Sequence, residues 1–153
     1  MVNSPQAETG PDQVQELLRE HAIRAAGRVP ALSLEGARMN PSCGDRVVVN
    51  CTLGESGLVL EWNGEGCSLM QAGASLLVTT VSGLQKEAAR ACLLQAIRLA
   101  SLAGVQEDAH ASTAYSQVMA VMRLMQAKPN RRECLLLAWR AVLDWLERSD
   151  MVP

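Results

Sequence analysis

The segment that decides the fold is residues 47–62, which read VVVNCTLGESGLVLEW. Alternate positions are apolar on both sides of residues 54–57, a spacing of two that is typical of half-buried β-strands. The four residues between the two runs begin and end with glycine, which indicates a tight hairpin turn. We therefore predict an antiparallel pair of strands here.

Helical patterns flank this hairpin. Before it, apolar residues recur with helical spacing over 14–25, and Gly27 and Pro30 end the pattern. After it, the uncharged run 68–81 predicts a buried helix, and three further helices are expected at 86–102, 114–125 and from about Cys134 to Arg148. A short additional strand is expected around 31–38. The predicted fold class is α+β, with a small antiparallel three-stranded sheet and helices packed on one face.

The chain length fits one compact domain. Its 153 residues suffice for a sizeable core. Residues 1–11 contain Pro, Gly, Ser and Thr and little hydrophobic content, so we expect a flexible tail there and a single domain over 12–150.

Charge and cysteine content narrow the function classes. The 14 Lys and Arg residues nearly balance 16 Asp and Glu residues, so no nucleic-acid partner and no anionic membrane partner is expected. No signal peptide or membrane span is recognisable, which favours a cytoplasmic location. Thiols stay reduced there, and five irregularly spaced cysteines favour metal or thiol chemistry over disulfides.

Three short motifs place metal ligands at predicted boundaries between loops and regular elements. They are NPSCGD at 40–45, GEGCS at 64–68 and RREC at 131–134. They contribute the candidate ligands Cys43, Asp45, Cys67 and Cys134. Three thiolates and one carboxylate can fill a tetrahedral zinc shell, so we predict a Zn²⁺ site, with iron or a [2Fe–2S] cluster as the alternative.

Local chain chemistry supports this placement. Gly44 lets the first motif turn sharply, so that Cys43 and Asp45 can project toward one point, and Gly64 and Gly66 are expected to do the same in the second. Cys67 then falls at a helix start, where free N–H groups favour a thiolate.

The third motif is expected to open the last helix. Cys134 follows Pro129 and Asn130, so it too is predicted near a helix start. Arg131, one turn earlier, would add positive potential there.

Taken together, the three motifs resemble the SufU-type zinc-dependent sulfurtransferases of the IscU/NifU N-terminal iron–sulfur assembly family. The resemblance covers roughly residues 12–148 in the same order. It implies a SufE/NifU-like fold and metal binding by Cys43, Asp45, Cys67 and Cys134. It also implies that Cys43 accepts persulfide sulfur from a SufS-type cysteine desulfurase, that Arg131 supports the docked or ligand-exchanged state, and that downstream iron–sulfur assembly proteins are partners.

Departures from the family pattern separate its branches. Scaffold members carry His immediately before the last cysteine, where this chain has Glu133, and they carry a Leu-Pro-Pro-Val-Lys segment that is absent here. Both differences favour the sulfur-transfer branch. The first helix keeps only Glu20 and His21 of the usual family pattern.

Plainer interpretations compete with each signal. A free cysteine is often a core residue, and we assign that role to Cys51 and Cys92. Asp45 could cap a turn, and Arg131 could be an ordinary solvated cation. His21 and His110 are interpreted as a helix-face and a loop residue.

Three functions therefore remain open. The first is zinc-dependent sulfur transfer, the second is a scaffold on which a [2Fe–2S] cluster is assembled and passed on, and the third is a purely structural zinc site.

Overall fold

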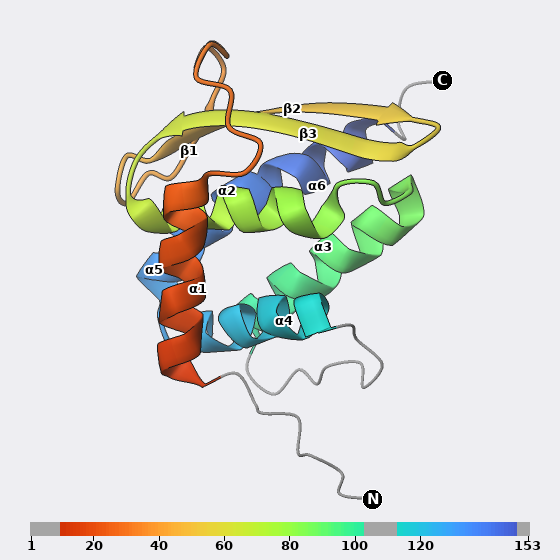
Figure 1. Ribbon diagram of the computed structural model, residues 1–153. Helices are drawn as coiled ribbons and strands as arrows, with labels where there is room; N and C mark the ends of the chain where they lie inside the picture. Colours follow the sequence, from red (N-terminus) through yellow and green to blue (C-terminus); the bar gives the residue numbers. More distant parts are fainter. Residues whose placement is uncertain (1–9, 103–112, 150–153) are drawn as a thin grey trace, which may run out of the picture.

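The computed structural model describes residues 10–102 and 113–149, and Figure 1 shows a sheet lying across a layer of helices. The elements run in the order α1 (Pro11–Arg24), β1 (Arg38–Met39), β2 (Arg46–Gly54), β3 (Gly57–Glu65), α2 (Ser68–Val81), α3 (Lys86–Ser101), α4 (Thr113–Met125), α5 (Pro129–Leu135) and α6 (Leu137–Ser149). The predicted α+β class is confirmed. No helix in these two stretches is both long and apolar enough to cross a bilayer.

The hairpin forms as predicted. Strands β2 and β3 pair antiparallel, and Gly54 lies opposite Gly57 across a two-residue turn. Gly57 has a φ of 94°, and a Cβ there would lie 2.4 Å from the carbonyl oxygen of Gly83. Only glycine meets both conditions. The inner face of the pair is built from buried side chains of Val47, Cys51, Leu58, Leu60 and Trp62.

The third strand is shorter and later than expected. Strand β1 spans Arg38–Met39 only and pairs antiparallel with β2, giving the order β1-β2-β3. The preceding residues use their backbone groups elsewhere: Leu32 N–H donates to the carbonyl of Val29 at 3.0 Å, and Ala37 N–H closes a turn on Leu34 at 3.1 Å. Those groups are therefore not available for the sheet ladder predicted over 31–38.

Helix α2 runs through the centre of the molecule. It contacts α1, α4, α5, α6 and β3, and Figure 1 shows it beneath the sheet. A Cβ on Gly73 would lie 2.2 Å from the carbonyl oxygen of Leu135, and Trp139 Nε1 donates to the carbonyl of Gly73 at 2.9 Å. Small residues in α2 thus let the C-terminal helices pack close to it.

The prediction of a single last helix from about Cys134 to Arg148 is wrong, because the structure has two helices there. Leu136 belongs to neither helix and separates α5 from α6. Leu135, Leu136 and Leu137 are all buried at this junction. The break lets α5 pack on α2 while α6 also packs under β2.

At the N-terminus, α1 begins at Pro11 after Gly10, one residue inside the predicted tail. The rest of that tail, residues 1–9, lies outside the described residues, as does His110.

Candidate metal centre

The first motif forms a compact loop between β1 and β2. Asn40 N–H donates to the carbonyl of Asp45 at 2.9 Å, and Gly44 N–H donates back to the carbonyl of Asn40 at 2.8 Å. Gly44 has a φ of 77°, as its predicted turn requires. The loop holds Cys43 at its exposed tip and Asp45 at its base, where Asp45 is only 4% exposed.

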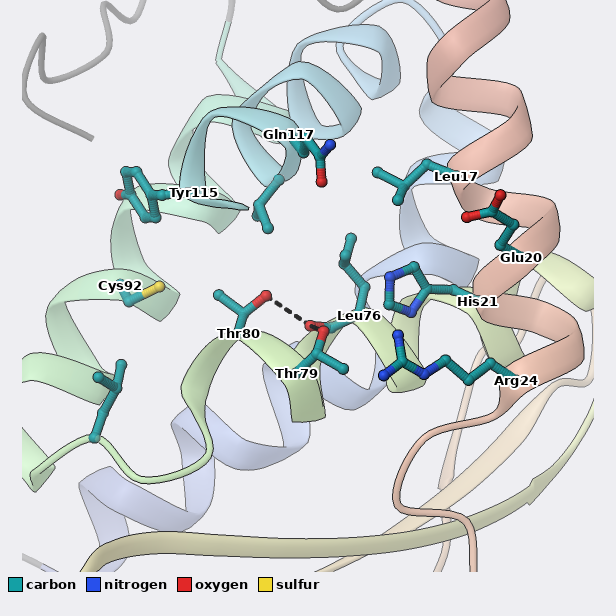
Figure 2. A pocket seen from close by; sticks show the side chains of 12 residues that line it. Leu17, Glu20, His21, Arg24, Leu76, Thr79, Thr80, Cys92, Tyr115 and Gln117 are labelled. Carbon is teal, nitrogen blue, oxygen red and sulfur yellow. Dashed lines mark hydrogen bonds between the residues drawn. The ribbon is translucent and has the colours of Figure 1, made fainter. Parts of the chain in front are cut away.

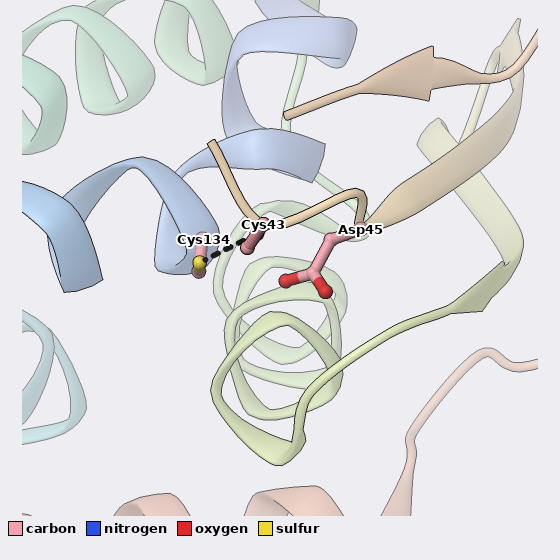
Figure 3. A group of neighbouring side chains, drawn as sticks. All are labelled: Cys43, Asp45 and Cys134. Carbon is pink, nitrogen blue, oxygen red and sulfur yellow. Dashed lines mark hydrogen bonds between the residues drawn. The ribbon is translucent and has the colours of Figure 1, made fainter. Parts of the chain in front are cut away.

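Cys134 meets this loop from the other end of the chain. Its Sγ lies 3.2 Å from Cys43 Sγ. One ligand atom from each of Cys43, Asp45 and Cys134 can be chosen so that all three lie within 4.8 Å of one another. Figure 3 shows the three side chains pointing toward a common point from the loop and from α5. Residues about ninety positions apart in sequence are thereby brought together.

Cys67 adjoins this group through Asp45. It is the N-cap residue of α2, as predicted. Its thiol donates to Asp45 Oδ2 and its backbone N–H donates to Asp45 Oδ1, both at 3.1 Å. The structure therefore brings three candidate ligands to one point and places the fourth beside them, on the same carboxylate.

The glycines of the second motif act differently from our expectation. A sharp turn was predicted, but neither Gly64 nor Gly66 has a positive φ. Both are needed for close approach instead: a Cβ on Gly64 would lie 2.5 Å from the carbonyl oxygen of Arg46, and one on Gly66 would lie 2.4 Å from Asp45 Oδ1. Gly66 thus makes room for the carboxylate.

Cys134 is not at a helix start. It lies in the last turn of α5, because the helix begins at Pro129 and ends at Leu135. The helix N-terminus therefore does not favour its thiolate as predicted. Burial raises the pKa of Cys134 well above the ordinary value, and hydrogen bonding with Cys43, the charge of Cys67 and hydrogen bonding with Asp45 raise it further.

Asn40 is a site residue that sequence reasoning missed. It is 4% exposed, and its Nδ2 donates to Cys134 Sγ at 3.4 Å while its Oδ1 accepts from Ser42 N–H at 3.1 Å. It therefore ties the loop to α5. Its place as the first residue of the NPSCGD motif was the available signal.

Electrostatics make Asp45 the anion of the group. Burial alone would raise its pKa, but hydrogen bonds from the thiol and N–H of Cys67 and from the thiols of Cys43 and Cys134 outweigh burial and hold it below the usual value. Burial and the adjacent Asp45 raise the pKa of Cys67, although the N–H groups of Met70 and Leu69 lower it. The predicted effect of the helix start is present and is outweighed.

Arg131 lies on the wall of a cavity that opens onto the sulfurs. The cavity has a volume of about 710 Å³ and is lined by Cys43, Cys67, Cys134 and apolar residues of α1 and α2. Ile23, on its rim, is 81% exposed. Glu133 points elsewhere, since its two carboxylate oxygens each pair with Arg140 at 3.1 Å.

The remaining cysteines belong to the packing of the molecule. Cys51 is buried on the inner face of β2, and burial raises its pKa to about 12. Cys92 packs against the core from α3, and burial raises its pKa to about 11. His21 is a helix-face residue, as interpreted, and bonds to Ser75.

The donor set fits a thiophilic divalent ion. Around a tetrahedral ion with bonds of about 2.3 Å to sulfur, neighbouring sulfurs lie about 3.8 Å apart, so the observed 3.2 Å between Cys43 and Cys134 needs only a small adjustment. The carboxylate of Asp45 is anionic, and the pKa values of two of the three neighbouring thiols, those of Cys67 and Cys134, are raised. A bound cation would stabilise the carboxylate and the deprotonated form of these thiols.

Known proteins share this sequence and fold. The NifU-like N terminal domain family matches residues 21–132, a stretch that includes Cys43, Asp45 and Cys67 and stops two residues before Cys134. An iron–sulfur cluster assembly scaffold protein IscU from Streptococcus pyogenes serotype M1 is 28% identical over 111 residues, which are 72% of this chain and 67% of that protein.

Two solved structures show the same fold. The N-terminal part of a nitrogen-fixing NifU-like protein from Brucella abortus superimposes with a TM-score of 0.70 at 17% identity, over 90% of this chain and 94% of that chain. A protein described as an iron–sulfur cluster assembly scaffold for the SUF system, from Fervidobacterium islandicum AW-1, superimposes with a TM-score of 0.62 at 20% identity, over 86% and 95%. Since the family match spans more than half of the chain, this protein belongs to the NifU-like N-terminal domain family, whose iron–sulfur assembly members the three motifs resemble.

Proposed function

We propose that this chain serves iron–sulfur cluster assembly as a SufU-type sulfurtransferase, accepting persulfide sulfur at Cys43 from a SufS-type cysteine desulfurase. One observation carries the proposal: an exposed thiol stands at the tip of a loop, directly above a buried thiol and a buried carboxylate. Family membership and the likeness to an IscU scaffold protein support the cluster-assembly context.

The transfer step is a thiol exchange. The Cys43 thiolate attacks the outer sulfur of a persulfide on the donor enzyme, a new S–S bond forms at Cys43, and the donor cysteine leaves as a thiolate. No external oxidant or reductant is needed, because the sulfane sulfur moves with its oxidation state unchanged. The exposure of Cys43 allows the approach that this reaction requires.

Cys43, Asp45, Cys67 and Cys134 are the residues that would hold a Zn²⁺ ion in this proposal. When bound, zinc would keep the thiols deprotonated at neutral pH. Asp45 is suited to hold the remaining ligands together, because it already accepts hydrogen bonds from Cys67. Asn40 keeps Cys134 oriented toward the loop.

Arg131 is proposed to assist the incoming donor. It lies on the rim of the cavity that leads to Cys43, in a mostly apolar wall. An arginine there would attract an acidic residue or the anionic persulfide of the donor. Transfer of sulfur to a thiol requires that thiol to stay reduced, which fits the expected cytoplasmic location. Downstream iron–sulfur assembly proteins would then receive the sulfur.

A scaffold for a [2Fe–2S] cluster is the second candidate. The names of the relatives from Streptococcus and Fervidobacterium favour it, since both are described as scaffold proteins. The cluster would be cargo held by Cys43, Cys67 and Cys134 with Asp45 as a weaker ligand that eases release.

A desulfurase assay tests the proposal. The purified chain is mixed with a SufS-type desulfurase and cysteine, and alanine release and the mass of each cysteine-containing peptide are followed. We expect faster alanine release and one added sulfur on Cys43, together with about one zinc per purified chain. Arg131→Ala should slow the transfer, whereas Arg148→Ala, an exposed arginine on α6, should not.

Two outcomes contradict this assignment. If a SufS-type enzyme is not stimulated and no sulfur is added to Cys43, the transferase proposal is wrong. If anaerobic iron and sulfide then give a coloured protein that passes an intact cluster to an apo-acceptor, the scaffold function replaces it.

A further inference from the structure

A second cavity lies on the other side of α1, and none of Cys43, Cys67 and Cys134 lines it. Its volume is about 580 Å³, and helices α1, α2, α3 and α4 all contribute to its wall. That size lies within the range of about 300–1,000 Å³ in which small-molecule sites are found. Figure 2 shows Glu20, His21 and Arg24 directed from α1 toward this space. None of them takes part in the proposed metal centre.

His21 is a buried polar group that is aimed into the cavity. It is 7% exposed, and its Nδ1 lies 2.9 Å from Ser75 Oγ. Ser75 Oγ already accepts a hydrogen bond from Ala26 N–H at 2.9 Å, so its own proton is available for Nδ1. Burial lowers the pKa of His21 and the charge of Arg24 lowers it further, which together outweigh the opposing effect of the Glu20 charge. The neutral ring then carries its hydrogen on Nε2, the nitrogen that Figure 2 shows facing the cavity.

Among the described residues that line the cavity, Glu20 carries a negative charge and Arg24 a positive one. Glu20 and Arg24 stand one helical turn apart on α1, with His21 between them (Figure 2), and both are exposed. A ligand with only a negative charge would be attracted by Arg24 and repelled by Glu20, and the reverse holds for a cation. A ligand that carries both charges matches both side chains.

The rest of the wall supplies hydrogen-bond acceptors and an apolar surface. Thr79 and Thr80 line the cavity, and their hydroxyls donate to the carbonyl of Leu76 at 3.0 and 2.6 Å, so each oxygen keeps lone pairs that can accept a hydrogen bond. An ammonium group needs such acceptors. The apolar part of the wall consists of Leu17, Leu76, Leu84 and Val118, with the ring of Tyr115.

We propose that this cavity binds an α-amino acid with an apolar side chain. Its carboxylate contacts Arg24 and the Nε2–H of His21, its ammonium group contacts Glu20, and its side chain lies against the leucines and Val118. The site is separate from the cysteine centre, so the proposal does not depend on sulfur transfer.

Ligand binding can be measured on the chain alone. Tyr115 is the only tyrosine of the sequence and lines the cavity, so 3-fluorotyrosine labelling gives a single ¹⁹F signal there. Phenylalanine is titrated as the probe, with phenethylamine and 3-phenylpropionate as probes that each lack one charged group. We expect saturable binding of phenylalanine, and binding weaker by about tenfold or more for each of the other two.

Variants decide whether the proposed groups are responsible. Arg24→Gln and Glu20→Gln should each weaken phenylalanine binding by about tenfold. The matched control, Arg90→Gln, removes an exposed arginine of α3 that does not line the cavity and should leave binding unchanged. Because Glu20, Arg24 and Arg90 are exposed, all three variants should fold, and circular dichroism checks this.

Three results would overturn the inference. They are the absence of any saturable shift with phenylalanine at about 10 mM, equal affinity for the three probes, and unchanged affinity in both cavity variants. Equal affinity would mean that the cavity is merely apolar and recognises neither charge.

Discussion

The open end of the β2–β3 hairpin and the middle of its sheet both carry cysteine, but the two regions differ in chemistry. In mid-strand, Cys51 points into the core opposite Leu60, and burial alone raises its pKa. At the open end, Cys43 and Cys67 lie around Asp45, and the thiols of both form hydrogen bonds with its carboxylate. The Cys43 thiol also contacts the thiol of Cys134. Residue type is the same, and position in the element decides what the thiol can do.

The reason lies in how sheets end. Along a strand the backbone groups pair with each other and the side chains alternate into a packed layer. Where the ladder stops, loops and helix starts expose N–H groups, and polar side chains can gather there without a loss of core packing. Cys67 N–H donating to Asp45 is one such contact.

Replacing Cys43, at the tip of its loop, should have the largest of the four effects. Cys43→Ser should abolish the sulfur that the wild type gains from a desulfurase with cysteine, since the hydroxyl is a far weaker nucleophile. Peptide mass spectrometry measures this. Cys92→Ser, which changes a helix cysteine, is the control and should gain sulfur normally. If the Cys43→Ser variant still gained one sulfur per chain, on another cysteine, the assignment of the sulfur-accepting role to Cys43 would be wrong.

The packing beneath Cys134 is tested next. Gly73→Ala would place a methyl group against the backbone of Leu135, which lies next to Cys134, and should lower the free energy of unfolding by about 1–3 kcal/mol. Urea denaturation measures it. Gly54→Ala is the control, because nothing lies within 4 Å of its Cβ position. Equal stability of both variants would show that α5 can move, so that the position of Cys134 does not depend on the core.

The charge at the open end should have a smaller effect. Asp45→Asn keeps the shape and removes the anion, and it should weaken zinc binding by at least about tenfold, as measured by competition with a chelator. Glu65→Gln is the matched control, because Glu65 is an exposed acid at the same end of the sheet that pairs with Arg46. If both substitutions weakened binding equally, general electrostatics rather than ligation by Asp45 would explain the affinity.

The mid-strand cysteine should have the smallest effect, visible only at high pH. The pKa of Cys51 rises from 9.0 to about 12 on folding, so its buried neutral thiol favours the folded state fully below pH 9. That contribution is lost as the pH rises from 9 toward 12, since the unfolded chain ionises first. Cys51→Ala should therefore lose less stability than the wild type between about pH 8 and pH 10, as judged by the urea midpoints. A steeper loss in the variant would contradict the assigned burial.

Sequence reasoning reached the hairpin, α2, α3 and α4 because their patterns are local. A two-residue period around 54–57 and an uncharged run over 68–81 are visible in a short window. The division at Leu136 escaped it, because three successive buried leucines depend on which elements lie on either side. The start of β1 escaped it as well, because the N–H groups of Leu32 and Ala37 close turns on Val29 and Leu34 instead of joining the sheet.

The amino-acid sequence by itself determined which residues could be ligands: Cys43 and Asp45 on either side of Gly44 in one loop, and Cys67 at a helix start. Only the tertiary structure decided that Cys134 reaches them from the last turn of α5, that Asn40 holds it there, and that Gly66 leaves room for the carboxylate. Backbone conformation is set by neighbours along the chain. The meeting of side chains ninety residues apart is set by the packing of α2 against α5, which no local pattern contains.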